Sequence, residues 1–131
     1  MAKKQIATFL APNKGLSIVG NHAYAYSGEV SVANTEINLL DFVSGKDYIT
    51  AKVQLGSNAG ENEDYVFKIY FNGTVVFSTL FNNQGAQYVD VANSIPVIIP
   101  PLTNVQMSLD NIADTDTRVW TVHMVGRVYD A

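Results

Sequence analysis

The sequence contains no cysteine among its 131 residues. This absence excludes thiol catalysis and thiolate metal sites, and it means that the fold does not depend on an oxidising compartment. A chain of this length can bury roughly two-thirds of the surface that its unfolded form exposes. We therefore expect a single domain that is stable without a disulfide or a metal.

Charge and long apolar runs are also scarce. The eight Lys and Arg residues are scattered along a chain of net charge −4, which leaves no basic patch for phosphate backbones and argues against nucleic acid as a partner. No run of about 18 apolar residues occurs, so no membrane span is expected. Residues 1–10 lack the apolar core of a signal peptide, so we expect a soluble chain made without a leader.

Sequence motifs for catalysis are missing as well. There is no Gly-x-Ser-x-Gly elbow and no phosphate-binding loop. His22 and His123 lack the spacing of zinc ligands, and His123 fits a packed or interface position better than a general base. Acidic residues cluster in two turns, where solvated side chains are commoner than a calcium site. These clusters are Glu61, Glu63 and Asp64, and Asp110, Asp114 and Asp116. We predict no enzyme activity, no cofactor and no metal site.

Alternation of apolar and polar side chains is the main signal that is present. Residues 104–111 place Val105, Met107 and Leu109 on one face of a strand and polar side chains on the other. Residues 48–55 repeat this pattern. Both segments are typical of strands that cover a core on one face only.

Two turn signals punctuate the strands. Asn72-Gly73 separates two apolar segments, and this pair suits a two-residue type I′ turn because both positions need a positive φ. Pro100 and Pro101 cannot donate to a ladder and bias the preceding residue to extended backbone, so they mark a corner before residues 104–111. Further strands are expected at 37–42, 65–71, 74–81, 88–91, 97–99 and 119–129.

About eight short strands with regular turns predict an all-β fold, an antiparallel two-sheet β-sandwich of the jelly-roll type. Residues 1–20 are broken by proline and glycine and are interpreted as an extended N-terminal arm, followed by one sandwich domain over 21–131. The buried residues expected from the alternation are Val53, Leu55, Phe67, Ile69, Val105, Met107, Leu109 and Trp120.

Five aromatic residues suggest an alternative function. A platform of exposed rings is the physical basis of sugar stacking, although sandwich cores and subunit interfaces use the same residues more often. The residues concerned are Tyr24, Tyr26, Tyr70, Tyr88 and Trp120. A carbohydrate-binding module with a possible glycan ligand therefore stays open beside a core or interface role.

Several segments resemble small virion proteins of tailed phages, particularly aquatic ones. They are Ala23-Tyr24-Ala25-Tyr26-Ser27-Gly28, Leu40-Asp41-Phe42, Phe67-Lys68-Ile69-Tyr70-Phe71-Asn72-Gly73, Ile98-Ile99-Pro100-Pro101-Leu102-Thr103 and Gly126-Arg127-Val128-Tyr129. The resemblance implies a jelly-roll head protein, made in the host cytoplasm and carried on the outer surface of the phage head. It further implies a decoration (cement) protein or a head-fibre or receptor-binding component, with the major capsid protein as partner.

The arm is the predicted bridge to that partner. Ile6, Phe9, Leu10 and Leu16 are apolar residues in a segment with too little pattern to fold alone, and an ordered partner surface would explain them. Residues 65–71 and 74–81 carry apolar side chains on both faces, which predicts self-association as a homotrimer in preference to a homodimer.

Overall fold

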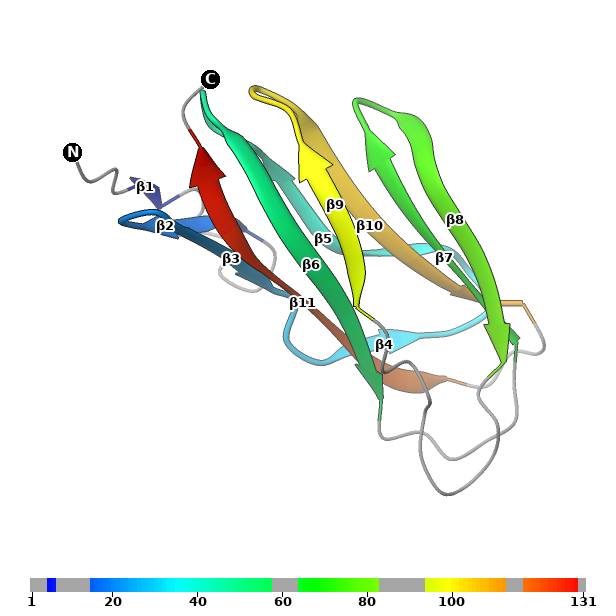
Figure 1. Ribbon diagram of the computed structural model, residues 1–131. Helices are drawn as coiled ribbons and strands as arrows, with labels where there is room; N and C mark the ends of the chain where they lie inside the picture. Colours follow the sequence, from blue (N-terminus) through cyan, green and yellow to red (C-terminus); the bar gives the residue numbers. More distant parts are fainter. Residues whose placement is uncertain (1–4, 7–14, 58–63, 83–93, 113–116, 130–131) are drawn as a thin grey trace.

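The structure is a computed structural model that describes residues 5–6, 15–57, 64–82, 94–112 and 117–129. Every regular element in these ranges is a β-strand, and the strands form two antiparallel sheets that face each other (Figure 1). The predicted all-β sandwich is confirmed. No helix long and apolar enough to cross a bilayer occurs within the same ranges.

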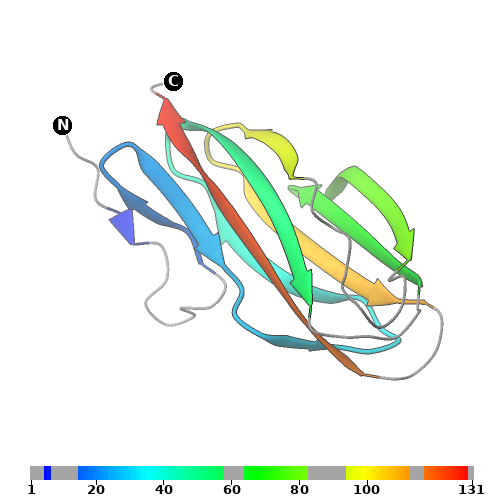
Figure 2. The same ribbon diagram turned by 60° about the horizontal axis from the view of Figure 1, so that its bottom comes forward.

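The larger sheet has seven strands, six of them in the order β1-β2-β3-β11-β6-β9. The short strand β4 pairs with β11 beside this path. Figure 2 shows β11 running along the middle of this sheet. The strands are β1 (Gln5–Ile6), β2 (Ser17–Val19), β3 (His22–Tyr26), β4 (Val30–Val32), β6 (Tyr48–Ser57), β9 (Ile95–Ile99) and β11 (Arg118–Tyr129).

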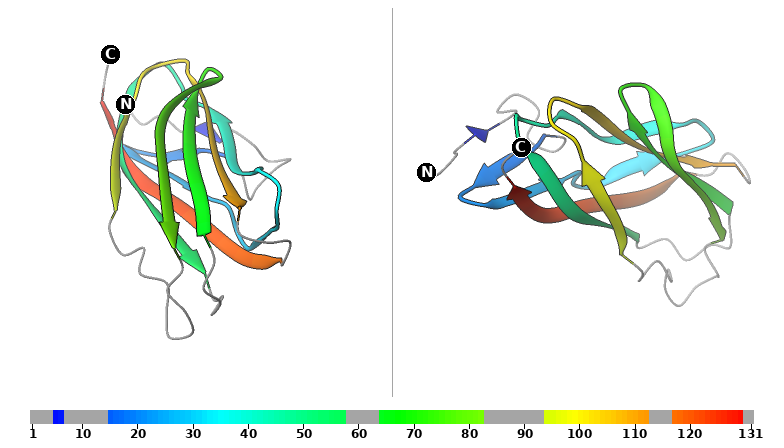
Figure 3. Two further views of the ribbon diagram at one scale, coloured as in Figure 1. Left: turned by 90° about the vertical axis from the view of Figure 1, so that its right-hand side faces the viewer. Right: turned by 45° about the horizontal axis from the view of Figure 1, so that its top comes forward.

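The smaller sheet has four strands in the order β5-β10-β7-β8. They are β5 (Ile37–Val43), β7 (Asp64–Phe71), β8 (Thr74–Asn82) and β10 (Asn104–Asn111). Strands β8 and β9 end their sheets on the same side of the sandwich (Figures 1 and 3). The chain changes sheet between β4 and β5, β5 and β6, β6 and β7, β8 and β9, β9 and β10, and β10 and β11. This alternation, with β3-β11-β6-β9 facing β5-β10-β7-β8, is the connectivity of a jelly roll.

The predicted hairpin between β7 and β8 is confirmed. Asn72 and Gly73 have φ values of 52° and 84°, the left-handed values that a type I′ turn requires at both positions. The ladder pairs Phe71 with Thr74 directly across the turn. The backbone amide of Asn104 donates to the Asn72 side-chain oxygen at 2.9 Å, which ties the hairpin to the start of β10.

One apolar core lies between the sheets. All eight residues predicted from the alternation are buried there. Trp120 and Tyr65, which face each other from opposite sheets, are fully buried with ring centroids 4.8 Å apart and an interplanar angle of 60°. Such an edge-to-face pair contributes beyond the area it buries.

The end of the predicted arm is hydrogen-bonded to the large sheet. Strand β2 pairs with β3, and β1 pairs with β2. The side chains of Leu16 and Ile18 are buried in the core, with 2% and 6% of their surface exposed. The division of the chain at residue 20 stays a prediction.

Two other predictions differ from the structure or fall outside it. Strands β1 to β4 were not expected, because segments of two to five residues carry too little alternation to be distinguished from the loops around them. The strand predicted at 88–91 lies outside the described residues.

Candidate interaction surfaces

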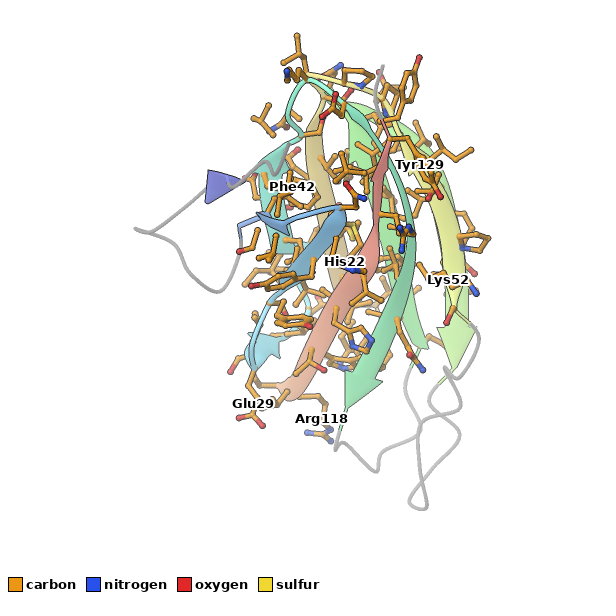
Figure 4. The ribbon with its side chains drawn as sticks, turned by 60° about the vertical axis from the view of Figure 1, so that its left-hand side comes forward. His22, Glu29, Phe42, Lys52, Arg118 and Tyr129 are labelled. Carbon is orange, nitrogen blue, oxygen red and sulfur yellow. The ribbon has the colours of Figure 1, made fainter. Side chains whose placement is uncertain are left out.

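Exposed apolar residues gather at one end of the sandwich, which we call the apolar end. Leu102, with 71% of its surface exposed, lies in the corner between β9 and β10. Tyr48 and Tyr129 are direct cross-strand partners where β6 begins and β11 ends. Ile98 lies near the end of β9, and Val43 closes β5. Figure 4 shows Tyr129 at this end, with Glu29 and Arg118 at the other.

The corner that carries Leu102 is held by hydrogen bonds to the corner between β5 and β6. The Ser44 hydroxyl donates to the Pro100 carbonyl at 2.8 Å and accepts from the Thr103 amide at 2.9 Å. The Leu102 amide donates to the Gly45 carbonyl at 2.8 Å. Leu102 has a φ of 53°, which costs a non-glycine residue about 1 kcal/mol or more. The corner thus fixes an apolar side chain in solvent at an energetic cost.

A groove of about 710 Å³ crosses the outer face of the large sheet. Strands β11, β6 and β9 form it, and Gly126 and Ala51 lie among its lining residues. The outward side chains along it are Thr50, Lys52, Pro96, Ile98, Val125 and Arg127. The ladder places Lys52 between Val125 and Pro96. Arg127 lies between Thr50 and His22, two residues along β11 from Val125.

Aromatic rings continue this face across β3 and β11. The rings of Tyr24 and Tyr26 lie 5.2 Å apart, and that of His123 meets Tyr26 edge-on at 6.2 Å. His123, directly opposite Tyr26 in the ladder, is exposed. Half of the Tyr26 surface is exposed. His22 of β3 is also exposed and is the cross-strand partner of Arg127 (Figure 4).

The outer face of the small sheet carries a hydrogen-bonded carboxylate. Glu36 accepts from the hydroxyls of Tyr70 and Ser108, both at 2.5 Å. These two hydrogen bonds, with Lys68 nearby, hold the Glu36 pKa below its ordinary value. The hydrogen bond to Glu36 raises the pKa of Tyr70. Asp41 accepts from Asn104 and Gln106 on the same face, at 3.4 Å each.

We expect Glu36→Gln to lower stability only above mildly acidic pH. A carboxylate with a lowered folded-state pKa contributes stability above its unfolded-state pKa, and loses it as the pH falls through the folded-state value. Because Glu36 is exposed, the loss at neutral pH should be about 0.5 to 1 kcal/mol. Urea unfolding from pH 7 to pH 3 tests this, and a difference that persists unchanged at pH 3 would contradict it.

The structure separates the residues that the sequence grouped as candidate sites. Trp120 is fully buried and cannot belong to an exposed platform, Tyr70 is engaged with Glu36, and Tyr88 lies outside the described residues. In the acidic clusters, Glu61, Glu63, Asp114 and Asp116 also lie outside them. Among the residues that are described, no three His, Cys, Asp or Glu side chains are grouped as metal ligands.

The four predicted partner-binding residues are only partly described. Leu16 is buried in the core of its own chain. Ile6 lies in β1, but its side chain is not described, and Phe9 and Leu10 lie outside the described ranges. Their contact with a partner stays a prediction.

Neither the apolar end nor the groove that Lys52 and Arg127 line was predicted from the sequence. Leu102 follows two prolines and gives no sign of its positive φ. Lys52 and Arg127 are 75 positions apart in the sequence and meet only through the pairing of β6 with β11. Outward alternation within each strand was visible, but it does not tell which strands are neighbours.

Comparison of the sequence finds no matching family model and no matching curated protein. Comparison of the structure finds VP2 of infectious bursal disease virus in its subviral particle, at a TM-score of 0.50 and 12% identity. The match covers 97% of this chain but only 38% of the VP2 chain. VP2 from T=1 particles of that virus matches at a TM-score of 0.47 and 11% identity. This match covers 98% of this chain and 37% of that VP2 chain.

A pilus protein of Bacillus endospore appendages also matches, at a TM-score of 0.47 and 9% identity. It covers 82% of this chain and 88% of the pilus chain. At these identities the matches bear on the fold alone, and the VP2 match at 0.50 agrees with the jelly roll.

Proposed function

We propose that this chain is a non-catalytic structural protein of a virion, which decorates the outer surface of a phage head and bridges neighbouring major capsid subunits. The observation that carries the proposal is the apolar end, where Leu102 is held rigidly in solvent at a positive φ. Large exposed apolar patches mark sites of association. The fold shared with VP2 from a viral particle supports the same role.

Bridging needs two contacts, and the chain offers two apolar segments for them. The first is the apolar end, and the second is the arm with Ile6, Phe9 and Leu10. Leu16 is held in the core, so it would link a bound arm mechanically to the sandwich. Each molecule would add interface area between subunits and so stabilise the assembled shell by mass action. Self-association as a homotrimer, in preference to a homodimer, remains part of the proposal.

We expect two variants to lose occupancy on undecorated heads. Deletion of residues 1–14 removes the arm contact but keeps Leu16, and Leu102→Asp places a charge in the apolar contact. Each should weaken binding by about tenfold or more, since burying an unpaired charge or losing an apolar contact costs at least 1 to 2 kcal/mol. Quantitative co-sedimentation with heads measures this.

Ile112→Asp is the matched control, because Ile112 is also an exposed apolar residue but follows β10 at the opposite end of the sandwich. It should bind as the unaltered chain does. If the deletion variant keeps full occupancy, the arm is not an anchor. If Leu102→Asp also keeps it, the apolar end is not the docking surface.

Carbohydrate binding is the second candidate, and the ring pair of the half-buried Tyr24 and the exposed Tyr26 favours it. Pyranose rings stack on such surfaces. A glycan-array signal that the Tyr26→Ala variant loses would support a receptor-binding or head-fibre role. An array without signal would reject carbohydrate binding and leave decoration as the remaining candidate role.

A further inference from the structure

The two outer faces of the sandwich carry charge of opposite sign. Within the described strands, the large sheet directs Lys52 and Arg127 outward, with His22 and His123, and no carboxylate. The outer face of the small sheet carries four carboxylates and one lysine. These residues are Glu36, Asp41, Asp64, Asp110 and Lys68. One face is therefore basic and the other acidic.

Each face also presents apolar side chains to solvent. On the basic face, Val125 and Ile98 are 45% and 65% exposed beside the groove. On the acidic face, Leu80 and Val75 of the edge strand β8 are 62% and 44% exposed. Neither Lys52 nor Arg127 has an ion-pair partner among the residues that the structure describes. Both faces thus resemble the two halves of one interface, with apolar area and complementary charge.

We propose that the basic outer face of one copy packs on the acidic outer face of a second copy. The groove lies over β11, β6 and β9, and the apolar ridge of the other face lies along β8. Since β8 and β9 end their sheets on the same side of the sandwich (Figure 3), a nearly parallel stack places the ridge over the groove. Packed sheets tolerate the angle of about 30° that their twist imposes.

The small sheet sets the size of such a contact. Its four strands have 7 to 9 residues, and with a spacing of about 4.8 Å and a rise of about 3.3 Å per residue they give a face of roughly 440 to 570 Å². Specific interfaces bury about 800 Å² per partner, so this contact belongs to the smaller, concentration-dependent class. Each exposed charge pair adds only about 0.2 to 1 kcal/mol. The charges would therefore mainly orient the two copies, and the apolar side chains of the groove and of β8 would supply most of the binding free energy.

Charge also decides which faces meet. Two basic faces or two acidic faces repel each other, so the contact is between unlike faces. Because these faces point in opposite directions, every added copy leaves one face of each kind free, and the stack stays open. This inference goes beyond the proposed function and does not need a capsid. It is an alternative to the homotrimer of the proposed function: a mass that stops at three copies would support the trimer and reject the stack.

Two variants, each altered on one face at exposed positions, test the proposal. Lys52→Glu with Arg127→Glu reverses the basic face, and Ser78→Lys with Leu80→Lys alters the ridge. In sedimentation velocity, the unaltered chain should form species larger than dimers as concentration rises. This association should weaken by about tenfold or more between roughly 0.05 and 0.5 M salt. Each variant alone should stay monomeric, and their mixture should form a one-to-one dimer through the two unaltered faces.

Lys46→Glu is the control, since it changes net charge as Lys52→Glu does but lies in the corner between β5 and β6. It should associate normally, and circular dichroism should show all variants folded. A chain that stays a 14.3 kDa monomer, a mass that stops at a trimer, or a variant mixture without a dimer would each overturn the proposal. Head binding is measured separately: a stack without head binding rejects only the proposed function, and head binding without a stack rejects only this inference.

Discussion

Replacing Gly126 with alanine should destabilise the protein by about 3 kcal/mol or more, near the upper end of what overpacking costs. A Cβ at this position would lie 2.1 Å from the Thr50 carbonyl oxygen and 2.7 Å from the Cα and Cβ of Ala51. Ordinary contacts begin at about 3.5 Å. Because these atoms include the backbone of β6, which pairs with β11 beside Gly126, the clash is relieved only by moving a central strand.

Gly56→Ala is the matched control in the same pair of strands. Its Cβ would lie 3.1 Å from the Thr121 side-chain oxygen, which can rotate away. We expect a loss below about 1 kcal/mol there. Urea unfolding followed by the fluorescence of the single tryptophan compares the two variants. If Gly126→Ala unfolds within about 0.5 kcal/mol of the unaltered chain, the close approach of β6 and β11 is wrong.

Trp120→Ala should cost about 3 to 5 kcal/mol, as large-to-small changes in a close-packed core do. The side chain is fully buried and packs edge-on against Tyr65 of the opposite sheet, so its removal leaves a cavity between the sheets. This is a large share of a typical stability of about 5 to 15 kcal/mol. Far-UV circular dichroism must follow this unfolding, because the variant has no tryptophan.

Val125→Ala controls for the change of strand, because Val125 lies in β11 but is 45% exposed. It should lose less than about 1 kcal/mol. An equal loss in both variants would mean that Trp120 is not part of the core. A loss below about 1 kcal/mol in Trp120→Ala would mean the same.

Much of the fold was predictable because its signals are local. Period-2 alternation placed Val105, Met107 and Leu109 in the core, and Asn72-Gly73 specified its own turn. A buried residue such as Trp120 needs only to be large and apolar. The predictions for strands and core follow from these properties of single segments.

The surfaces were less predictable because they depend on which strands become neighbours. The groove joins β6, β9 and β11, which are distant in sequence. The clash expected in Gly126→Ala arises in the same way, from the close approach of β6 to β11. A glycine within a predicted strand does not indicate such an approach by itself. The positive φ of Leu102 is imposed by the hydrogen bonds of Ser44 and Gly45 to its corner, another contact between distant segments.

The place of β11 in the large sheet affects how the protein can be synthesised. This strand lies between β3 and β6 and pairs with both, yet it is the last described strand that the ribosome makes. Until residue 129 has emerged, β3 and β6 each lack their shared neighbour, and their backbone edges remain open to other chains. Folding must therefore wait for contacts between distant segments, which form slowly. A nascent chain stalled before residue 118 should be an aggregation hazard that needs a chaperone, whereas a chain that includes β11 buries both edges at once.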